Sequence, residues 1–376
     1  MTAMLNNSLS LTTEGTNFSS VNGSLNGTPE VPSCPFVSFS DYQPELIPAI
    51  YSIIFILGFV GNSVVVAVLC LQMGCKTVAS TYILNLAISD LLFLTSLPLW
   101  AVYYAFGYNW IFGAVMCKIC GSLLCINLYA SIFFITCMSV DRYLAIVYPF
   151  QSQRSRSLCQ AQSVTFLMWT LACLSTLPTM CFRNTYNIPE LGVTACIMDF
   201  PNPRESWFVA MALMKNILGF LIPFTVIASC YIGIGKHLLG ATGLDKNTQH
   251  RDRALRMVVA VMMAFFFCWC PFHIITFLDV LTRLNLIQSC GVKAMIDTAV
   301  PFTLCIAFAN STINPFLYCF VGNHFREQLS RLSERRLPHI FSKRGSTSTR
   351  LSSFSRKLSD VKELGVLDKF VQTKGP

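Results

Sequence analysis

The chain has 376 residues, of which 53% are apolar and 12% charged, with a net charge of +9 at neutral pH. A soluble domain carries about 25% charged residues, so this composition, with a mean hydropathy of +0.56, excludes an ordinary soluble protein. The positive charge is concentrated in segments between and after long apolar runs, which is typical of the cytoplasmic side of a membrane protein rather than of nucleic-acid binding.

The first 45 residues differ from the rest of the chain. They contain four acidic residues and no Lys or Arg, and they carry four Asn-x-Ser/Thr sequons, at Asn6, Asn17, Asn22 and Asn26. Sequons in a Gly/Ser/Asn-rich segment are typical of a glycosylated, disordered tail outside the cell. Because no stretch here has the apolar core of a cleavable signal peptide, we expect the first membrane helix to direct insertion.

Seven long segments downstream are almost free of charge. They span residues 46–75, 81–105, 119–140, 157–182, 206–235, 257–278 and 298–325, and Asp90 and Lys215 are the only charged residues in them. A helix needs about 20 apolar residues to cross the hydrocarbon core. We therefore predict an all-α membrane protein, with a seven-transmembrane helix bundle over residues 46–320.

Basic residues place the C-terminus in the cytoplasm. Residues 236–256 hold five Lys/Arg and two acids, and residues 321–376 hold twelve Lys/Arg and five acids, as cytoplasmic segments do. Residues 322–333 are predicted to form a short amphipathic eighth helix on the inner leaflet. The Ser/Thr cluster between Ser346 and Ser355 suits phosphorylation, or is simply a solvated polar tail.

Four cysteines fall on the predicted outer side: Cys34, Cys117, Cys196 and Cys290. An even number in an oxidising compartment suggests two disulfides, but four cysteines allow three connectivities.

Asp90 is a carboxylate near the middle of the second segment, where a charge at membrane depth is a functional hypothesis by default. Amides and hydroxyls are expected at a similar depth, on Asn62, Asn127, Ser131, Asn310 and Asn314. One carboxylate among such groups suits a small hard cation or a proton. Structural packing between helices accounts for the same residues, and spacing does not decide between the two.

The acid–base pair Asp141-Arg142 ends the third apolar segment. It fits a local latch, in which movement of a neighbouring helix exposes the Arg, and it also fits a solvated helix end.

Each predicted helix carries a short motif. In order these are Gly61-Asn62, Leu86 to Asp90, Asp141-Arg142-Tyr143, Trp169, Pro223 with Tyr231, Cys268-Trp269-x-Pro271 and Asn314-Pro315-x-x-Tyr318. The set resembles the rhodopsin-like (class A) G protein-coupled receptors over residues 46–333.

Four longer stretches are similar to the angiotensin II receptors of that family: ASIFFITCMSVDRY (130–143), ALMKNILGF (212–220), CPFHIITFLD (270–279) and NPFLYCFVGN (314–323). The resemblance implies a plasma-membrane receptor for an angiotensin II-like peptide hormone, with a heterotrimeric G protein or arrestin as cytoplasmic partner. The alternatives are another peptide or chemokine-type receptor and, from a different class, an ion-coupled transporter using Asp90 and Lys215.

The resemblance also implies roles for motif residues. In this family Asp141 restrains Arg142 at rest, and helix six moves outward at its cytoplasmic end on activation. The activation set is Asp141, Arg142, Tyr143, Tyr231, Trp269, Pro271, Asn314, Pro315 and Tyr318. An allosteric sodium ion is expected at Asp90, Asn127, Ser131 and Asn310, and the implied disulfides are Cys117–Cys196 and Cys34–Cys290.

A ligand pocket with both signs of charge is predicted from the same comparison. Lys215 precedes Pro223 by eight residues, about 12 Å along a helix, and needs an anionic partner such as a peptide carboxylate, with Arg183 as second donor. Asp279 and Asp297 suit a cationic peptide side chain. Between the charges we expect Tyr51, Trp100, Tyr104, Leu124, Trp269, Phe272, His273 and Phe308, for most of which helix packing is an equally good explanation.

The sequence contains no enzyme motif. Its five histidines are scattered, and neither a phosphate-binding loop nor a Cys/His cluster with metal-ligand spacing is visible. We therefore expect no catalytic activity and no cofactor besides the sodium ion.

Overall fold

The computed structural model describes residues 43–73, 77–150, 157–189, 191–240 and 248–321, together with Phe325, Leu329 and Ser330. The chain divides into the units Met1–Arg326 and Glu327–Pro376, and the account below concerns the first. The predicted glycosylation sites, Cys34, the Ser/Thr cluster and most of the expected eighth helix lie outside the described residues.

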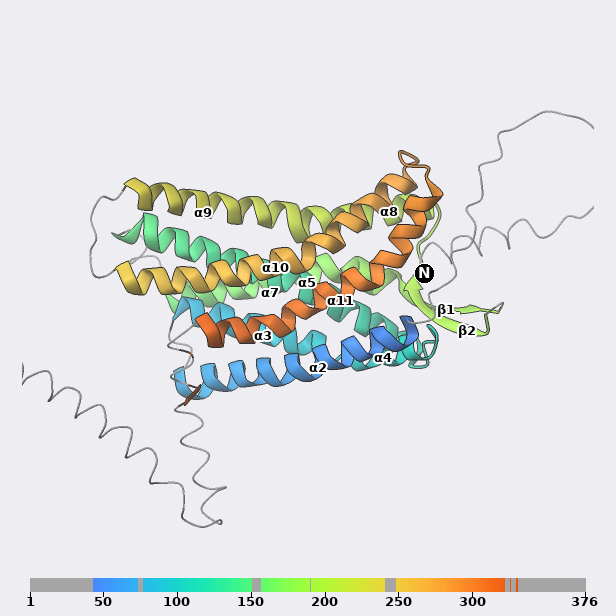
Figure 1. Ribbon diagram of the computed structural model, residues 1–376, viewed down its shortest axis with the longest axis horizontal. Helices are drawn as coiled ribbons and strands as arrows, with labels where there is room; N and C mark the ends of the chain where they lie inside the picture. The colour runs from blue at the N-terminus through green and yellow to red at the C-terminus, as the bar shows by residue number, and fades with distance from the viewer. Residues whose placement is uncertain are drawn as a thin grey trace, which may run out of the picture. The chain divides into compact units, whose positions relative to one another are not determined.

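Within the described residues, seven helices are long and apolar enough to cross a membrane, and they lie side by side along one direction (Figure 1). Helix one is α2 (Gln43–Val68) with a π-helical end, η1 (Leu69–Met73), and helix two comprises α3 (Val78–Leu94) and α4 (Leu97–Ala105). Helix three is α5 (Gly113–Val147), and helix four is α7 (Leu158–Phe182). Helix five comprises α8 (Arg204–Asn216), the π-helical η2 (Ile217–Leu221) and α9 (Ile222–Gly240). Helix six is α10 (Thr248–Arg283), and helix seven is α11 (Cys290–Val321). The predicted seven-helix bundle is confirmed.

Two of the interruptions lie next to prolines. Helix two breaks at Thr95 and Ser96, and Ser96 lies two residues before Pro98. The Ser96 hydroxyl donates to the Phe93 carbonyl at 2.7 Å. The π-helical turn η2 ends two residues before Pro223. Because proline has no N–H to donate and its ring clashes with the preceding turn, both helices depart from regular α geometry there.

The helices form a ring around a polar and aromatic interior. Helix α2 packs against α3, α4 and α11, helix α5 packs against α3, α7 and α9, and α10 packs against α11 and α8. The outer faces carry apolar side chains that are more than half exposed, such as Ile53 (57%), Phe166 (76%) and Phe267 (64%). Exposed apolar rows on helices of this length are the surface that a bilayer covers.

Helices one and seven approach closely through Gly61 and Asn62. A Cβ at Gly61 would lie 3.0 Å from the Pro315 ring, so glycine allows this contact. Pro315 lacks an N–H, which leaves the Ser311 carbonyl without its usual helical donor. Asn62 supplies one, since its amide nitrogen donates to Ser311 O at 2.8 Å and to Gly58 O at 2.9 Å.

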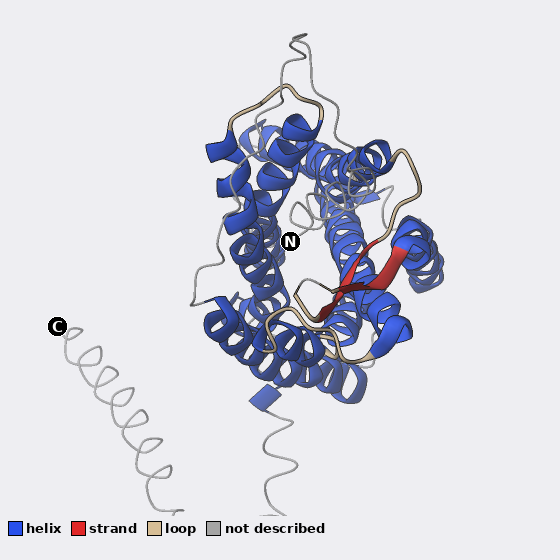
Figure 2. Ribbon diagram, turned by 90° about the vertical axis from the view of Figure 1, so that its right-hand side faces the viewer, coloured by secondary structure: helices blue, strands red, loops and turns tan. Residues whose placement is uncertain are grey.

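A β-hairpin follows helix four, and the sequence analysis did not anticipate it. Strands β1 (Arg183–Ile188) and β2 (Val193–Met198) pair antiparallel, with Thr185 opposite Cys196. Figure 2 shows the two red strands at one end of the helix ring, called the hairpin end below. The Trp110 N–H donates to the Thr194 carbonyl at 2.7 Å and so joins the hairpin to the loop between helices two and three.

Candidate functional site

Arg183 lies at the hairpin end as the first residue of β1. Its guanidinium carbon is 5.0 Å from the centre of the Trp100 ring, a cation–π contact, and Nη2 donates to the Cys196 carbonyl at 3.4 Å. Burial lowers the pKa of Arg183 from its ordinary value, but a guanidinium remains protonated at neutral pH. Arg183 forms no ion pair with any described residue, so the described part of the chain leaves its charge uncompensated.

Glycine at position 121 of α5 makes room for this side chain. A Cβ at Gly121 would lie 2.7 Å from Cδ and 2.9 Å from Nε of Arg183. Real Cβ atoms do not come this close to another heavy atom, so a larger residue would displace Arg183.

Lys215 is the second predicted cation of the pocket. It lies in the last turn of α8, two residues before η2, and is partly buried. It is near enough to the buried His273 for an electrostatic interaction. Among the residues that the structure describes, no acidic side chain pairs with Lys215.

His273 is held against helix five. Its Nδ1 lies 2.8 Å from Asn216 Oδ1, and its ring stacks on Phe220 with 4.8 Å between ring centres. Its Nε2 and the amide nitrogen of Asn216 are buried without a hydrogen-bond partner. Packing therefore accounts for one side of the imidazole, while the unpaired nitrogens suit a polar ligand group.

The predicted aromatic residues form two connected groups. Tyr51 contacts Tyr104 and Phe308, with ring centres 5.7 Å and 5.5 Å away, and Trp100 joins them through Tyr103. On helix six, Trp269 contacts Phe272 at 5.9 Å and His273 at 6.2 Å. Leu124 is partly buried on α5. The sequence analysis missed Tyr103, which is buried and joins Trp100 to the other rings.

The acidic end of the predicted pocket contains a basic residue that the sequence analysis did not assign. Arg283 Nε lies 3.3 Å from Asp279 Oδ1, one turn back along α10, and Arg283 Nη1 lies 2.9 Å from Glu205 Oε2 on α8. The Arg283 guanidinium carbon is 3.5 Å from the centre of the Phe208 ring. Asp279 is thus in an ion pair within the chain, and its predicted role toward a ligand cation stays a prediction.

Asp297 on α11 belongs to the same acidic region. It interacts electrostatically with Asp279 and Arg283, and it forms no ion pair of its own with a described residue. Asp297 thus lies near enough to Asp279 for an electrostatic interaction, and the role of the two carboxylates as a cation subsite stays a prediction.

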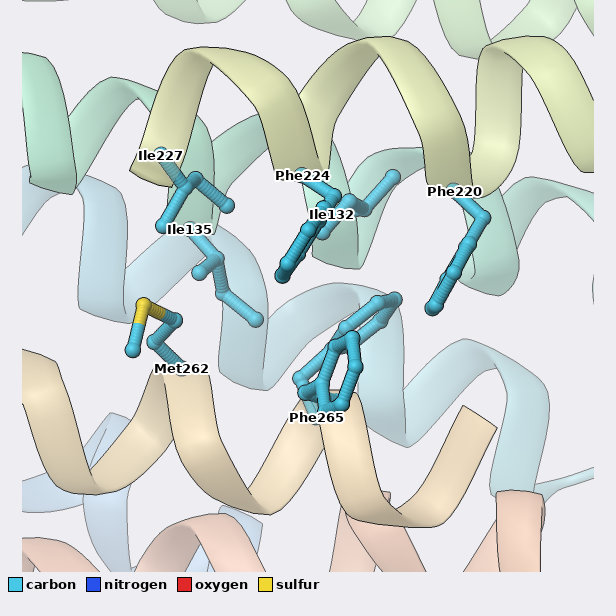
Figure 3. Close-up of a pocket in the computed structure, with 8 residues that line it drawn as sticks. Ile132, Ile135, Phe220, Phe224, Ile227, Met262 and Phe265 are labelled. Carbon is cyan, nitrogen blue, oxygen red and sulfur yellow. The ribbon is translucent and has the colours of Figure 1, made fainter. Parts of the chain in front are cut away.

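An apolar pocket lies deeper between helices three, five and six. Figure 3 shows its lining, which comprises Ile132, Ile135, Phe220, Phe224, Ile227, Met262, Phe265 and Phe266. Because none of these side chains is charged or polar, this pocket suits neither end of a charged ligand, and we do not assign the ligand site to it.

Asp90 is fully buried at the centre of a polar cluster. Its Oδ1 accepts from Ser311 Oγ at 2.7 Å and from Asn127 Nδ2 at 2.9 Å, and its Oδ2 accepts from Asn314 Nδ2 at 3.0 Å. The Asn127 amide nitrogen also donates to Ser131 Oγ at 3.3 Å, which adds Ser131 to the cluster. Ser311 was not predicted in this cluster, whereas Asn314 was expected at the depth of Asp90 but was not included in the sodium site.

The donors around Asp90 are all neutral, so its negative charge has no counterion among the described residues. Asn310, predicted in this set, makes no hydrogen bond to Asp90 that the structure describes. Its Oδ1 is nevertheless buried without a partner, as is Oδ1 of Asn314. Carboxylate, hydroxyl and amide oxygens are the ligands of hard cations, so these residues fit a sodium ion.

The opposite end of the bundle contains the Asp-Arg-Tyr motif. Arg142 Nη2 lies 3.1 Å from Asp141 Oδ2, and Asp141 is buried, so the predicted local ion pair is present. Tyr143 packs against Gly233 of α9, where a Cβ would clash with its ring. Tyr318 is fully buried.

The predicted disulfide Cys117–Cys196 is confirmed, with 5.7 Å between the two Cα atoms. It joins strand β2 of the hairpin to the second turn of α5. Cys290 is also disulfide-bonded. Its predicted partner, Cys34, lies outside the described residues, so that pairing stays a prediction.

Comparison with known proteins agrees with this geometry. The family described as 7 transmembrane receptor (rhodopsin family) matches residues 61–318. Type-2 angiotensin II receptors of Rattus norvegicus and Homo sapiens are each 52% identical over 320 residues, covering 85% of this chain and 88% of theirs. The type-1 angiotensin II receptor A of Rattus norvegicus is 42% identical over 327 residues, covering 87% of this chain and 91% of its own. The chain therefore belongs to the rhodopsin family of seven-transmembrane receptors, the class A G protein-coupled receptors, within its angiotensin II receptor group and with more similarity to the type-2 than to the type-1 relatives.

Proposed function

We propose that the chain is a plasma-membrane receptor for an angiotensin II-like peptide. The observation that supports this most directly is the pair of cations Arg183 and Lys215, neither of which has an ion-pair partner among the described residues. A buried or half-buried charge without a partner is costly, and a peptide carboxylate would supply an anionic partner to both side chains.

The opposite charges at Asp279 and Asp297 orient the peptide. A carboxylate bound by Lys215 and Arg183 gains charge-assisted hydrogen bonds in a water-poor site. A basic side chain of the same peptide would be attracted to the acidic region between α10 and α11 and repelled by the cations. An amphipathic peptide such as angiotensin II, with an acidic end, a basic side chain and aromatics, has this distribution.

Binding is transmitted along helix six. Trp269 is buried between Phe265 and Phe272, two residues before Pro271, where the helix has lost a hydrogen bond and can bend. We propose that the cytoplasmic end of helix six moves outward and that Arg142 leaves Asp141 to contact a G protein or arrestin.

Sodium is the proposed allosteric ion, held by Asp90 with oxygens of Ser131 and Asn310. When bound, the ion supplies the positive charge that the described residues around Asp90 lack. Asn127, Ser311 and Asn314 orient the carboxylate through their hydrogen bonds. These hydrogen bonds link helices two, three and seven around Asp90. A movement of helix seven would break the bonds from Ser311 and Asn314.

The proposed topology has the hairpin end outside the cell and the Asp-Arg-Tyr end in the cytoplasm. The sequons at the N-terminus and the basic C-terminal segment support it. A receptor of this kind has no catalytic residues, and phosphorylation of its Ser/Thr tail would favour arrestin.

The test is binding of labelled angiotensin II to intact cells that express either the wild-type chain or Lys215→Ala. Lys293→Ala is the matched control, because Lys293 is exposed near the start of α11. We expect saturable binding that is lost in Lys215→Ala and kept in Lys293→Ala at equal surface expression. No binding by well-expressed wild type would refute the ligand class, and direct binding of other labelled peptides would then be measured to identify the ligand. Equal affinity of Lys215→Ala and wild type would refute the carboxylate site.

A further inference from the structure

Arg283 joins the hairpin-side ends of helices five and six. It bonds Glu205 near the start of α8 and Asp279 near the end of α10, and it stacks on Phe208. Its side chain is only 9% exposed, while those of Glu205 and Asp279 are 56% and 21% exposed. The stacking and the two ion pairs hold the guanidinium in one place, which lies against the acidic side chain assigned to a ligand cation.

The ion pairs among the described residues of this region leave an excess of negative charge. Arg283 pairs with both Glu205 and Asp279, and Asp297 adds electrostatic repulsion toward Asp279. A second cation is therefore attracted to the region, but at Asp279 it meets a guanidinium of the receptor itself. A ligand cation must share Asp279 with Arg283 or displace it.

We propose that Arg283 is an internal competitor that sets how strongly the receptor favours basic ligands. The inference rests on the proposed role of Asp279 as a cation subsite. Glu205 weakens the hold of Arg283 on Asp279. The ion pair of Arg283 with Glu205 on helix five is 2.9 Å long, shorter than its 3.3 Å ion pair with Asp279. Removing Arg283 frees Asp279 for the ligand. Removing the charge of Glu205 leaves Asp279 as the ion-pair partner of Arg283 among the described residues.

The experiment measures one ratio, the preference for a basic ligand. It is the affinity for angiotensin II divided by the affinity for an analogue whose basic side chain is replaced by a neutral one of similar size. The ratio is measured on intact cells for wild type, Arg283→Met, Arg283→Lys, Glu205→Gln and Asp279→Asn. Lys293→Met is the matched control, since it also removes one positive charge at this end of the bundle, from an exposed site.

We expect Arg283→Met to raise the preference about tenfold, and Glu205→Gln to lower it. Arg283→Lys and Lys293→Met should both leave it within about threefold of wild type. A preference that is unchanged or lower in Arg283→Met, or raised equally in Lys293→Met, overturns the proposal. If Arg283→Met reaches the surface poorly, an unchanged or higher preference in Glu205→Gln overturns it.

Asp279→Asn separates this inference from the function on which it rests. Loss of the preference in Asp279→Asn with no change in Arg283→Met refutes the competition alone. A normal preference in Asp279→Asn refutes Asp279 as the cation subsite, and the competition with it.

Discussion

Replacing Gly121 with alanine should weaken binding of a peptide carboxylate without harming the fold. The new Cβ would lie 2.7 Å from Arg183 Cδ and 2.9 Å from Nε. An ordinary van der Waals contact needs at least 3.4 Å, so the Arg183 side chain has to move by about 0.7 Å or adopt another rotamer. The contacts with Trp100 and the Cys196 carbonyl restrict where it can go.

The magnitude follows from the hydrogen bond that Arg183 would lose. A hydrogen bond to a charged group contributes about 1.5–3 kcal/mol, so we expect the affinity for the peptide acid to fall by about 10- to 150-fold. Alanine has a higher helix propensity than glycine, by up to about 1 kcal/mol, and the variant should therefore remain folded.

The assay compares a peptide acid with its C-terminal carboxamide. Because the amide has no charge for Arg183 to bind, Gly121→Ala should weaken the acid much more than the amide. Gly235→Ala on α9 is the matched control, since a Cβ there meets nothing within 4 Å. Equal losses for acid and amide, or no loss for either, would show that the position of Arg183 is not what Gly121 protects.

Two further predictions concern the polar interior. Asp90→Asn removes the negative charge of the proposed sodium site. Sodium chloride should therefore give the purified wild type a higher unfolding temperature than choline chloride does, and the variant should unfold at the same temperature in both salts. A sodium-specific rise of the same size in both proteins would exclude Asp90 as the site. Asn62→Leu leaves the Ser311 carbonyl without a donor and should lower stability by about 2 kcal/mol, measured as thermal unfolding. Ser52→Ala removes an exposed hydrogen bond on the same helix and should change stability by less than about 0.5 kcal/mol; equal destabilisation by the two variants would contradict this account.

The seven helices could be predicted because each is a long run of apolar residues, and membrane length alone distinguishes such a run from a soluble core. The hairpin could not be predicted with the same certainty. Its strands are six residues each, and the stretches RNTYNI and VTACIM contain β-branched residues without a clean alternation. The turn signal between them, Pro189 and Gly192, was available in the sequence.

The charged residues of the proposed ligand site could be selected from the sequence, but not all of their partners could. Lys215, Arg183, Asp279 and Asp297 were selected because charges in or near apolar runs are rare, and their role in binding stays a prediction. The ion pair between Asp279 and Arg283 has the i, i+4 spacing of a helical pair and could have been found as well. Its link to Glu205 could not, because that contact joins residues 78 positions apart.

The position of Arg183 on the hairpin has a consequence for the maturation of the receptor. The strand that carries Arg183 is attached to the bundle through the bond between Cys117 and Cys196 and through the backbone contact with Trp110. A chain inserted in the membrane with both thiols still reduced would form all seven helices but would lack the covalent bond that holds Cys196, whose carbonyl accepts from Arg183, against α5. Full affinity for a peptide ligand would then depend on oxidation of the two thiols, and a reducing agent would lower that affinity while the helices stayed in the bilayer.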